Sequence, residues 1–177
     1  MQYTKYYDSP LGRIMLAADS EGLTGLWFEG EKYFAEYLSP EHEEGDSPAL
    51  DAAAEWLDVY FSGEDPGPLP PVHMTGTDFQ MSVWEILKEI PYGKTTTYGE
   101  IAKKIAEKRG LEKMSSQAVG GAVGHNGISI IIPCHRVVGS DGSLTGYAGG
   151  VDRKKAMLEL EGAYTEDMYV PKKGTAL

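Results

Sequence analysis

The sequence predicts an α+β protein, in which an antiparallel sheet with one helix is followed by a helix-turn-helix with a wing. Over the first thirty residues, short apolar and aromatic segments alternate with turn residues, as they do in small sheets. A proline-rich stretch at 63–76 then separates these segments from a half with helical periodicity. The 177 residues, of which 41% are hydrophobic, are enough for one large domain or two small ones.

The N-terminal half is expected to hold short strands and one helix. Residues 9–10 and 19–22 have the composition of turns between the strands. The acidic stretch 41–48 predicts a loop. A helix is predicted over 47–63, because Ser47 can serve as its N-cap, a proline follows at the first helical position and a glycine ends it. We expect this half to act as structural support.

The C-terminal half begins after the linker, which holds four prolines and should run extended. Apolar stripes predict one helix after Thr77 and a second that ends at Gly110. A third helical segment of small residues is expected to be capped by Ser115 or Ser116. The boundaries predict a support domain at 1–76, a second domain at 77–164 and a tail at 165–177.

Charge is divided unevenly along the chain. The net charge of −11 combines an acidic segment, 1–92, at −14 with a basic segment, 93–155, at +5 and a C-terminal segment at −2. A basic module with paired helices is compatible with a nucleic-acid partner. The helix pair alone is weakly specific, because most paired short helices bind no DNA. Its small residues would permit close approach to DNA, and they are equally compatible with tight helix packing.

The only cysteine, Cys134, follows the apolar run 128–133 and precedes His135. The run predicts a buried strand, in which a lone cysteine is usually structural. A thiolate nucleophile needs a base to accept its proton, and the adjacent imidazole is a candidate. Neighbours on a strand point to opposite faces, so direct contact requires a turn at Pro133-Cys134 or a bridging water. From the residues alone, a structural and a reactive Cys134 both remain open.

A glycine-rich loop and a closing helix follow the cysteine. The loop at 139–150 holds five glycines around Tyr147 and is expected to turn tightly beside a bound group. A helix is predicted over 151–162, with an aspartate near its start and a glycine as its stop. Glu161 in its last turn opposes the helix dipole, which indicates either a specific partner or simple exposure to solvent.

On these residues the chain resembles the methylated-DNA–protein-cysteine methyltransferases, the O6-alkylguanine-DNA alkyltransferases. The resemblance rests on "IPCHRVVGSDGSLTGYAGG", with "AVGGAVGHN" before it and "LELEG" after it. It covers residues 77–162, whereas the N-terminal half matches only in the order of its elements and in "SPLG". It implies an N-terminal ribonuclease H-like α/β domain and a C-terminal winged helix-turn-helix domain that carries the thiol.

The resemblance also implies an activity, DNA repair without a cofactor. Cys134 would irreversibly accept an alkyl group from O6 of guanine, and in some members from O4 of thymine. His135, held by Glu161, would take the thiol proton through a water. Tyr98 would donate a proton to the departing guanine and help to turn its nucleotide, while Asn126 would support the active-site hydrogen bonds. The implied substrate pocket includes Val137, Tyr147 and Ala148. The residues implied at the minor groove of double-stranded DNA, without sequence readout, are Thr96, Gly99, Ser115, Ser116, Gln117, Ala118, Gly120 and Arg136.

The sequence departs from the family pattern at three places. The arginine that usually fills the gap left by the turned nucleotide is Gln117 here, which predicts weaker affinity for duplex DNA or a different balance of nucleotide flipping. Gly127 follows Asn126 where the family usually has proline, which predicts a less rigid loop. The zinc ligands of some mammalian members have no cysteine counterpart, so no metal is expected.

Three alternative functions agree less well with the sequence. A non-catalytic lesion-binding protein of the related alkyltransferase-like group would lack the nucleophile, which is present. A cysteine hydrolase would leave the basic helix pair without a role, and a fused regulator would need a further cysteine-bearing domain. The chain shows no signal peptide, no membrane-spanning run and no second cysteine for a disulfide, so we expect a cytoplasmic monomer.

Overall fold

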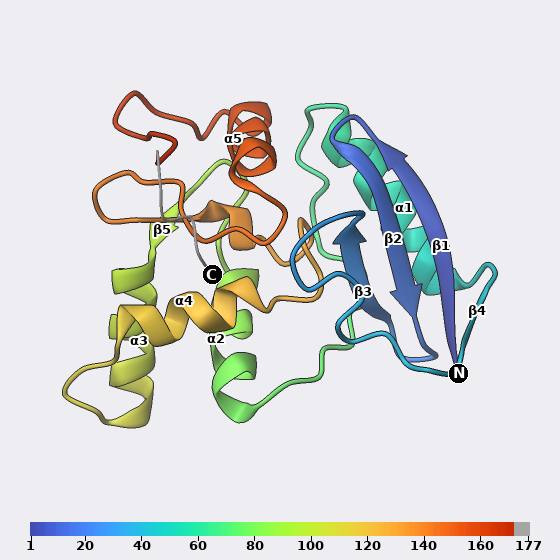
Figure 1. Cartoon of the computed structure of the whole chain (residues 1–177), viewed down its shortest axis with the longest axis horizontal. Helices are drawn as coiled ribbons and strands as arrows, with labels where there is room; N and C mark the ends of the chain where they lie inside the picture. The colour runs from blue at the N-terminus through green and yellow to red at the C-terminus, as the bar shows by residue number, and fades with distance from the viewer. Residues whose placement is uncertain (172–177) are drawn as a thin grey trace. The chain divides into compact units, whose positions relative to one another are not determined.

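The computed structural model describes residues 1–171, which form two compact units (Figure 1). The first unit contains Met1–Thr75 together with Gly127–Ile131, and the second contains Gly76–Asn126 and residues 132–171. Residues 127–131 lie inside the span predicted for the second domain, yet they pack with the first unit. No helix in residues 1–171 has the length and apolar character needed to span a bilayer.

The first unit is a four-stranded sheet with one helix beside it, drawn in blue and teal in Figure 1. Strand order is β3-β2-β1-β4, and only the β1–β4 pair is parallel. The helix α1 buries Leu50, Ala53, Leu57 and Tyr60, and it contacts β1, β2 and β3. Its predicted N-cap, Ser47, accepts a hydrogen bond from the amide of Leu50. The elements are β1 (Gln2–Ser9), β2 (Gly12–Ala18), β3 (Leu23–Phe28), β4 (His42–Glu44) and α1 (Pro48–Phe61).

The acidic stretch predicted as a loop is in part the edge strand β4. Its backbone pairs with β1, where the amide of Gly45 donates to the carbonyl of Thr4 at 3.1 Å. All three residues of β4 expose their side chains to solvent, and exposed acidic side chains give an edge strand the composition of a loop. The prediction was therefore wrong for His42–Glu44.

The apolar run 128–133 was predicted as a strand, and the structure corrects this prediction. Its residues are buried, but only Ile128 forms a bridge, with Leu26 of β3. The chain then turns at Ile130, whose φ is +70°, so the run cannot continue beside β3. Apolar content predicted the burial correctly, but burial alone does not require a partner strand.

Up to residue 171, the second unit is built from four α-helices, a short 3-10 turn and a two-stranded sheet. Thr77 and Gln80 form a capping box at the start of α2, and Gly110 ends α3 with φ +66°. The helix α4 packs against α2 and α3, and the indole of Trp84 donates to the carbonyl of Ala122 at 2.9 Å. The elements are α2 (Asp78–Lys88), β5 (Thr96–Thr97), α3 (Tyr98–Arg109), α4 (Ser116–Gly124), the 3-10 turn η1 (Cys134–Arg136), β6 (Val137–Val138) and α5 (Val151–Leu160).

Candidate active site

The only cysteine of the chain begins a tight turn, not a strand. Residues Cys134–Arg136 form η1, and the amide of Cys134 donates to the carbonyl of Ile132 at 2.8 Å. Directly afterwards β6 pairs in parallel with β5, so that Thr97 lies opposite Val138. Because the backbone turns at Pro133-Cys134, the rule that places strand neighbours on opposite faces does not apply to the thiol and the imidazole. Cys134 itself is 4% exposed.

The buried carboxylate of Glu161 binds two residues of η1 and the backbone of Gly93. Its Oε2 lies 2.5 Å from Nε2 of His135, and its Oε1 accepts from Nε of Arg136 at 2.7 Å. The amide of Gly93 donates to the same Oε1 at 3.1 Å. Glu161 is the C-cap of α5, where the helix dipole disfavours a carboxylate. The specific partner that its position indicated is therefore present, and solvent exposure is excluded.

The pKa values of Glu161 and His135 are both lowered within this set of contacts. Burial would raise the pKa of Glu161, but the hydrogen bonds and positive charges of His135 and Arg136 outweigh it and hold the pKa at about 2. Burial lowers the pKa of His135, and the nearby Arg136 and Lys154 lower it further, against the opposing effect of Glu161. The result is an ionised carboxylate that orients an imidazole able to accept a proton.

Arg136 is in a different environment from the one predicted. Its side chain is only 7% exposed, with one nitrogen on Glu161 and another donating to the carbonyl of Ile90 at 2.8 Å. Its guanidinium also lies 5.7 Å from the centroid of the Tyr92 ring. In this structure the guanidinium orients the carboxylate of Glu161, and the predicted contact of Arg136 with DNA stays a prediction.

Tyr98 and Lys154 meet at one backbone carbonyl in the glycine-rich loop. The hydroxyl of Tyr98, the first residue of α3, donates to Thr145 O at 2.8 Å, and Nζ of Lys154 donates to the same oxygen at 2.8 Å. Burial and the charge of the nearby Cys134 raise the pKa of Tyr98, which keeps its phenol protonated. Burial lowers the pKa of Lys154 to about 7, and the charge of Cys134 opposes this effect. The phenol, the amine and the thiol therefore lie within electrostatic range of one another.

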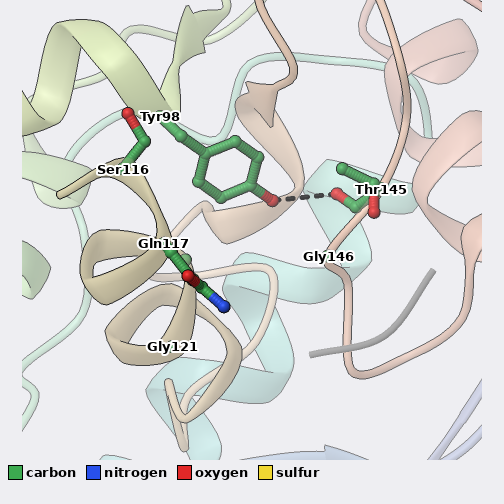
Figure 2. A pocket seen from close by; sticks show the side chains of 7 residues that line it. Tyr98, Ser116, Gln117, Gly121, Thr145 and Gly146 are labelled. Carbon is green, nitrogen blue, oxygen red and sulfur yellow. Dashed lines mark hydrogen bonds between the residues drawn. The ribbon is translucent and has the colours of Figure 1, made fainter. Parts of the chain in front are cut away.

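A cavity of about 540 Å³ opens beside Tyr98. This volume is in the range of small-molecule sites in proteins. Figure 2 shows the Tyr98 ring reaching across from α3 to the loop at Thr145, while Gln117 projects from the first turn of α4. Its walls combine one aromatic ring with short polar side chains and glycines. The lining residues are Tyr98, Ser116, Gln117, Gly120, Gly121, Thr145 and Gly146.

The small residues that were predicted to contact DNA lie at the exposed start of α4. Ser115 caps the helix by accepting from the amide of Ala118 at 3.2 Å, and residues 115–118 are all exposed. A Cβ at Gly120 would lie 3.9 Å from the Tyr98 ring, and one at Gly99 would lie 3.9 Å from Oγ of Ser116. The helix therefore presents an open face of short side chains and also packs closely on α3. Thr96, also predicted here, lies in β5 and donates to Glu100 at 2.9 Å.

The remaining predicted residues surround η1 and the loop after it. The amide nitrogen of the buried Asn126 side chain donates to the carbonyl of Ile132 at 2.8 Å, which ties the end of α4 to the approach to Cys134. Val137 is buried in β6, Tyr147 is 6% exposed, and Ala148 is partly exposed in the loop. Sequence reasoning missed Lys154, although it lies three residues after Val151 and four before Leu158, on the apolar face of α5.

Gly127, which replaces a proline usual in the family, has a local explanation. A Cβ at this position would lie 2.5 Å from the Tyr37 ring. The carbonyl of Gly127 accepts from the amide of Leu26 at 2.9 Å, and the amide of Ser129 donates to the carbonyl of Leu26 at 3.1 Å. A larger residue at 127 would require Tyr37 to move.

One cluster in residues 1–171 has the composition of a metal site. Ligand atoms of Asp19, Glu21 and His73 lie within 4.8 Å of one another. An ion pair accounts for the cluster, because Nδ1 of His73 lies 2.6 Å from Asp19, and the pKa of the histidine is raised by this contact. The pair joins the proline-rich segment to the turn after β2, so it serves a structural purpose.

Comparison with known proteins places both halves of the chain in one family. The model of the DNA-binding domain of 6-O-methylguanine DNA methyltransferase matches residues 78–163. The model of the ribonuclease-like domain of the same protein matches residues 2–67.

Full-length relatives support the same assignment. The chain is 42% identical to the methylated-DNA–protein-cysteine methyltransferase of Methanosarcina acetivorans, over 91% of this chain and 99% of the relative. It is also 42% identical to the protein of that name from Haemophilus influenzae, over 90% and 86% of the two chains. Among solved structures it is similar to Mycobacterium tuberculosis OGT in complex with DNA, with a TM-score of 0.76 and 41% identity over 93% of this chain and 96% of the other.

Proposed function

Because the chain belongs to the methylated-DNA–protein-cysteine methyltransferase family, we propose that it repairs DNA by moving an alkyl group from O6 of guanine to the sulfur of Cys134. The observation that supports Cys134 as the acceptor is the buried Glu161–His135 pair next to the only thiol of the chain. No feature of the site favours a non-catalytic lesion-binding protein, since the nucleophile and its base are both present.

The transfer is a displacement at carbon in which every proton has an acceptor. The thiol proton moves to the nitrogen of His135 that does not face Glu161, through a bridging water, and the thiolate sulfur attacks the alkyl carbon. The C–O6 bond breaks, and the electron pair stays on the guanine. Tyr98 donates its proton to N3 of the departing base, so that the base leaves neutral, and the proton on His135 restores the phenol. The thioether is stable, so each molecule acts once.

The target base must leave the duplex to reach the cysteine. O6 of guanine faces into the helix, and extrusion of the nucleotide brings it to the cavity beside Tyr98. The exposed short side chains at the start of α4 suit entry into the minor groove, where contacts to the backbone need no sequence readout. Gln117 would fill the gap left in the stack. We expect a monomer that acts in the cytoplasm on double-stranded DNA and uses no cofactor.

Mass spectrometry after incubation with DNA tests this function directly. The protein is mixed with a duplex containing one O6-methylguanine, under reducing conditions, and the peptide that carries Cys134 is weighed. A gain of one methyl group on this peptide, with at most one equivalent of repair, is expected. The Cys134→Ser variant should bind the lesion and transfer nothing. Absence of methylation with folded protein would reject the assignment, and lesion binding without transfer would favour the non-catalytic alternative.

A further inference from the structure

The chain after α5 folds back onto the glycine-rich loop. The amide of Tyr169 donates to the carbonyl of Gly142, and the amide of Leu144 donates to the carbonyl of Tyr169, both at 3.0 Å. These bonds form a parallel bridge between the two segments. The Tyr169 hydroxyl adds a hydrogen bond to Oδ2 of Asp141 at 2.7 Å. Residues 163–169, which make these contacts, are called the strap below.

Apolar packing joins the strap to the loop a second time. The side chain of Leu144 is fully buried, and Ala163 and Met168 of the strap belong to the same core cluster. Val138 of β6 and Leu158 of α5 complete this cluster. Removal of these side chains from water favours the arrangement in which strap and loop are in contact. Leu144 is therefore fixed through its backbone and also through its side chain.

The strap and the loop approach each other closely at Gly142. A Cβ at this position would collide with the carbonyl of Asp167, and the φ of +91° also favours glycine. The loop at 139–150 holds five glycines in all. Because glycine leaves the backbone free to adopt many conformations, such a loop depends on contacts with other segments for its position.

The residues directly after Leu144 form one wall of the cavity beside Tyr98. Thr145 and Gly146 line this cavity, and the rest of its lining comes from α3 and α4, which pack against each other. In Figure 1 the strap, in red, and α4 lie on opposite sides of this loop, which is drawn in orange. The width of the cavity therefore depends on where the loop lies. An adduct larger than methyl requires the loop to move away from the helices, and the strap opposes this movement.

We propose that the strap holds the glycine-rich loop against the cavity and thereby limits the size of the alkyl group that the protein accepts. Tyr169 is the positioning residue of the strap. It is not among the residues that line the cavity, and it acts through Leu144, whose neighbours Thr145 and Gly146 do line it. The inference rests on the function proposed above, because it concerns the same transfer to Cys134.

Single-turnover rates with a small and a large adduct test the strap. The full-length protein is mixed with a duplex that contains either O6-methylguanine or O6-butylguanine, and the loss of the adduct is followed with time. In both reactions the Cys134 sulfur bonds to the first carbon of the alkyl group as the C–O6 bond breaks. The intrinsic reactivity of each adduct is the same for every variant, so a change in the ratio of the two rates reports on the cavity. Total methyl uptake gives the concentration of active protein.

Substitutions at Tyr169 remove the contacts of the strap in steps. Tyr169→Pro lacks the amide that donates to Gly142, and it should lower the methyl-to-butyl rate ratio by about 5- to 10-fold, the factor that corresponds to one lost hydrogen bond. Tyr169→Phe loses only the exposed contact with Asp141 and should lower the ratio by less than about 3-fold. The control Val170→Ala, at an exposed position beside the strap, should leave the ratio unchanged.

Two further measurements keep the test decisive. Hydrogen exchange of the Leu144 amide, measured without DNA, should be about 10-fold faster in Tyr169→Pro than in the wild type, because the segment that binds this amide is loosened. If Tyr169→Pro does not fold, Met168→Ala decides by the same rate ratio and the same exchange measurement, since it removes an apolar anchor of the strap and keeps its backbone.

The outcomes separate the strap from the repair function. A wild-type protein that transfers neither group would refute the proposed function, and the inference with it. A wild-type protein that repairs both adducts equally fast, or variants in which both rates fall by the same factor, would overturn the role of the strap alone. Unchanged exchange of the Leu144 amide in the deciding variant would also overturn it, because the strap would then not hold the loop.

Discussion

Replacing Lys154 with methionine should stabilise the fold at neutral pH. The variant removes a fully buried amine and leaves a flexible apolar side chain of similar length in its place. The carbonyl of Thr145 keeps a donor, because the Tyr98 hydroxyl binds the same oxygen at 2.8 Å. A role in packing or hydrogen bonding would give the opposite result, since loss of a structural contact destabilises.

The magnitude follows from the pKa of Lys154, which burial lowers from 10.5 to about 7. Between these values the unfolded chain binds the proton more tightly than the folded chain, so the stability of the wild type rises with pH across this window. The cost of the buried amine is about 4 kcal/mol at pH 7 and about 2 kcal/mol at pH 9, and it is nearly absent at pH 10.5. The lost hydrogen bond subtracts about 1 kcal/mol. The net gain expected for the variant is therefore about 3 kcal/mol at pH 7.

Urea unfolding at pH 7 and pH 9 measures this gain. The difference in unfolding free energy between Lys154→Met and wild type should shrink by about 2 kcal/mol between the two pH values. Lys155→Met serves as the control and should show neither the gain nor the pH dependence. A destabilised Lys154→Met, or a gain that is equal at both pH values, would refute the reasoning that the cost of the buried amine is a protonation cost.

Three further variants test the rest of the site. Glu161→Gln should lose about 3 kcal/mol of stability at pH 7, because the pKa of the carboxylate is held at about 2 against an ordinary 4.5. In urea unfolding this loss should shrink as the pH falls from 4.5 toward 2. The control Glu159→Gln, at an exposed position of the same helix, should change stability by less than about 0.5 kcal/mol. Tyr98→Phe should slow single-turnover methyl transfer by about 10²- to 10⁴-fold with lesion binding retained, and an unchanged rate would exclude it as the proton donor. Gln117→Arg should tighten duplex binding, and the slope of the logarithm of the binding constant against the logarithm of salt concentration should steepen by about one, as measured by fluorescence anisotropy. Unchanged affinity and repair rate would contradict the proposal that residue 117 fills the gap left by the turned nucleotide.

Local signals predicted most of the helices correctly. Ser47, Thr77 and Ser115 each accept a hydrogen bond from an amide in the first turn, and Gly110 adopts the left-handed conformation that ends α3. These features depend on residues within one turn of each other, so the sequence contains all the information that they require. The conflict of Glu161 with the helix dipole is also visible in the sequence, but it left a specific partner and exposure to solvent both open, and only the family resemblance implied the contact with His135.

The failures arose where distant segments decide the structure. In the isoleucine run only Ile128 bridges to β3, and the chain then turns instead of continuing as a strand. The acidic residues of β4 form a strand because they pair with β1 at the edge of the sheet. The tail after α5 gave no pattern of its own. Yet Tyr169 exchanges backbone hydrogen bonds with the glycine-rich loop, through the carbonyl of Gly142 and the amide of Leu144, both at 3.0 Å. Backbone pairing of this kind leaves no mark on side-chain composition.

Both ends of α5 carry charges that the helix itself disfavours. Lys154 lies near the end that favours anions, and Glu161 caps the end that favours cations. A helix selected for stability alone would have the reverse arrangement, and the rest of the buried face of α5 is apolar. Each charge instead has a partner outside the helix, since Glu161 binds His135 of η1 and Lys154 donates to Thr145 O in the glycine-rich loop. The two ends of one helix thus hold the imidazole and this loop in a fixed relation, and we infer that the site, more than the stability of the helix, determines the residues at these two positions.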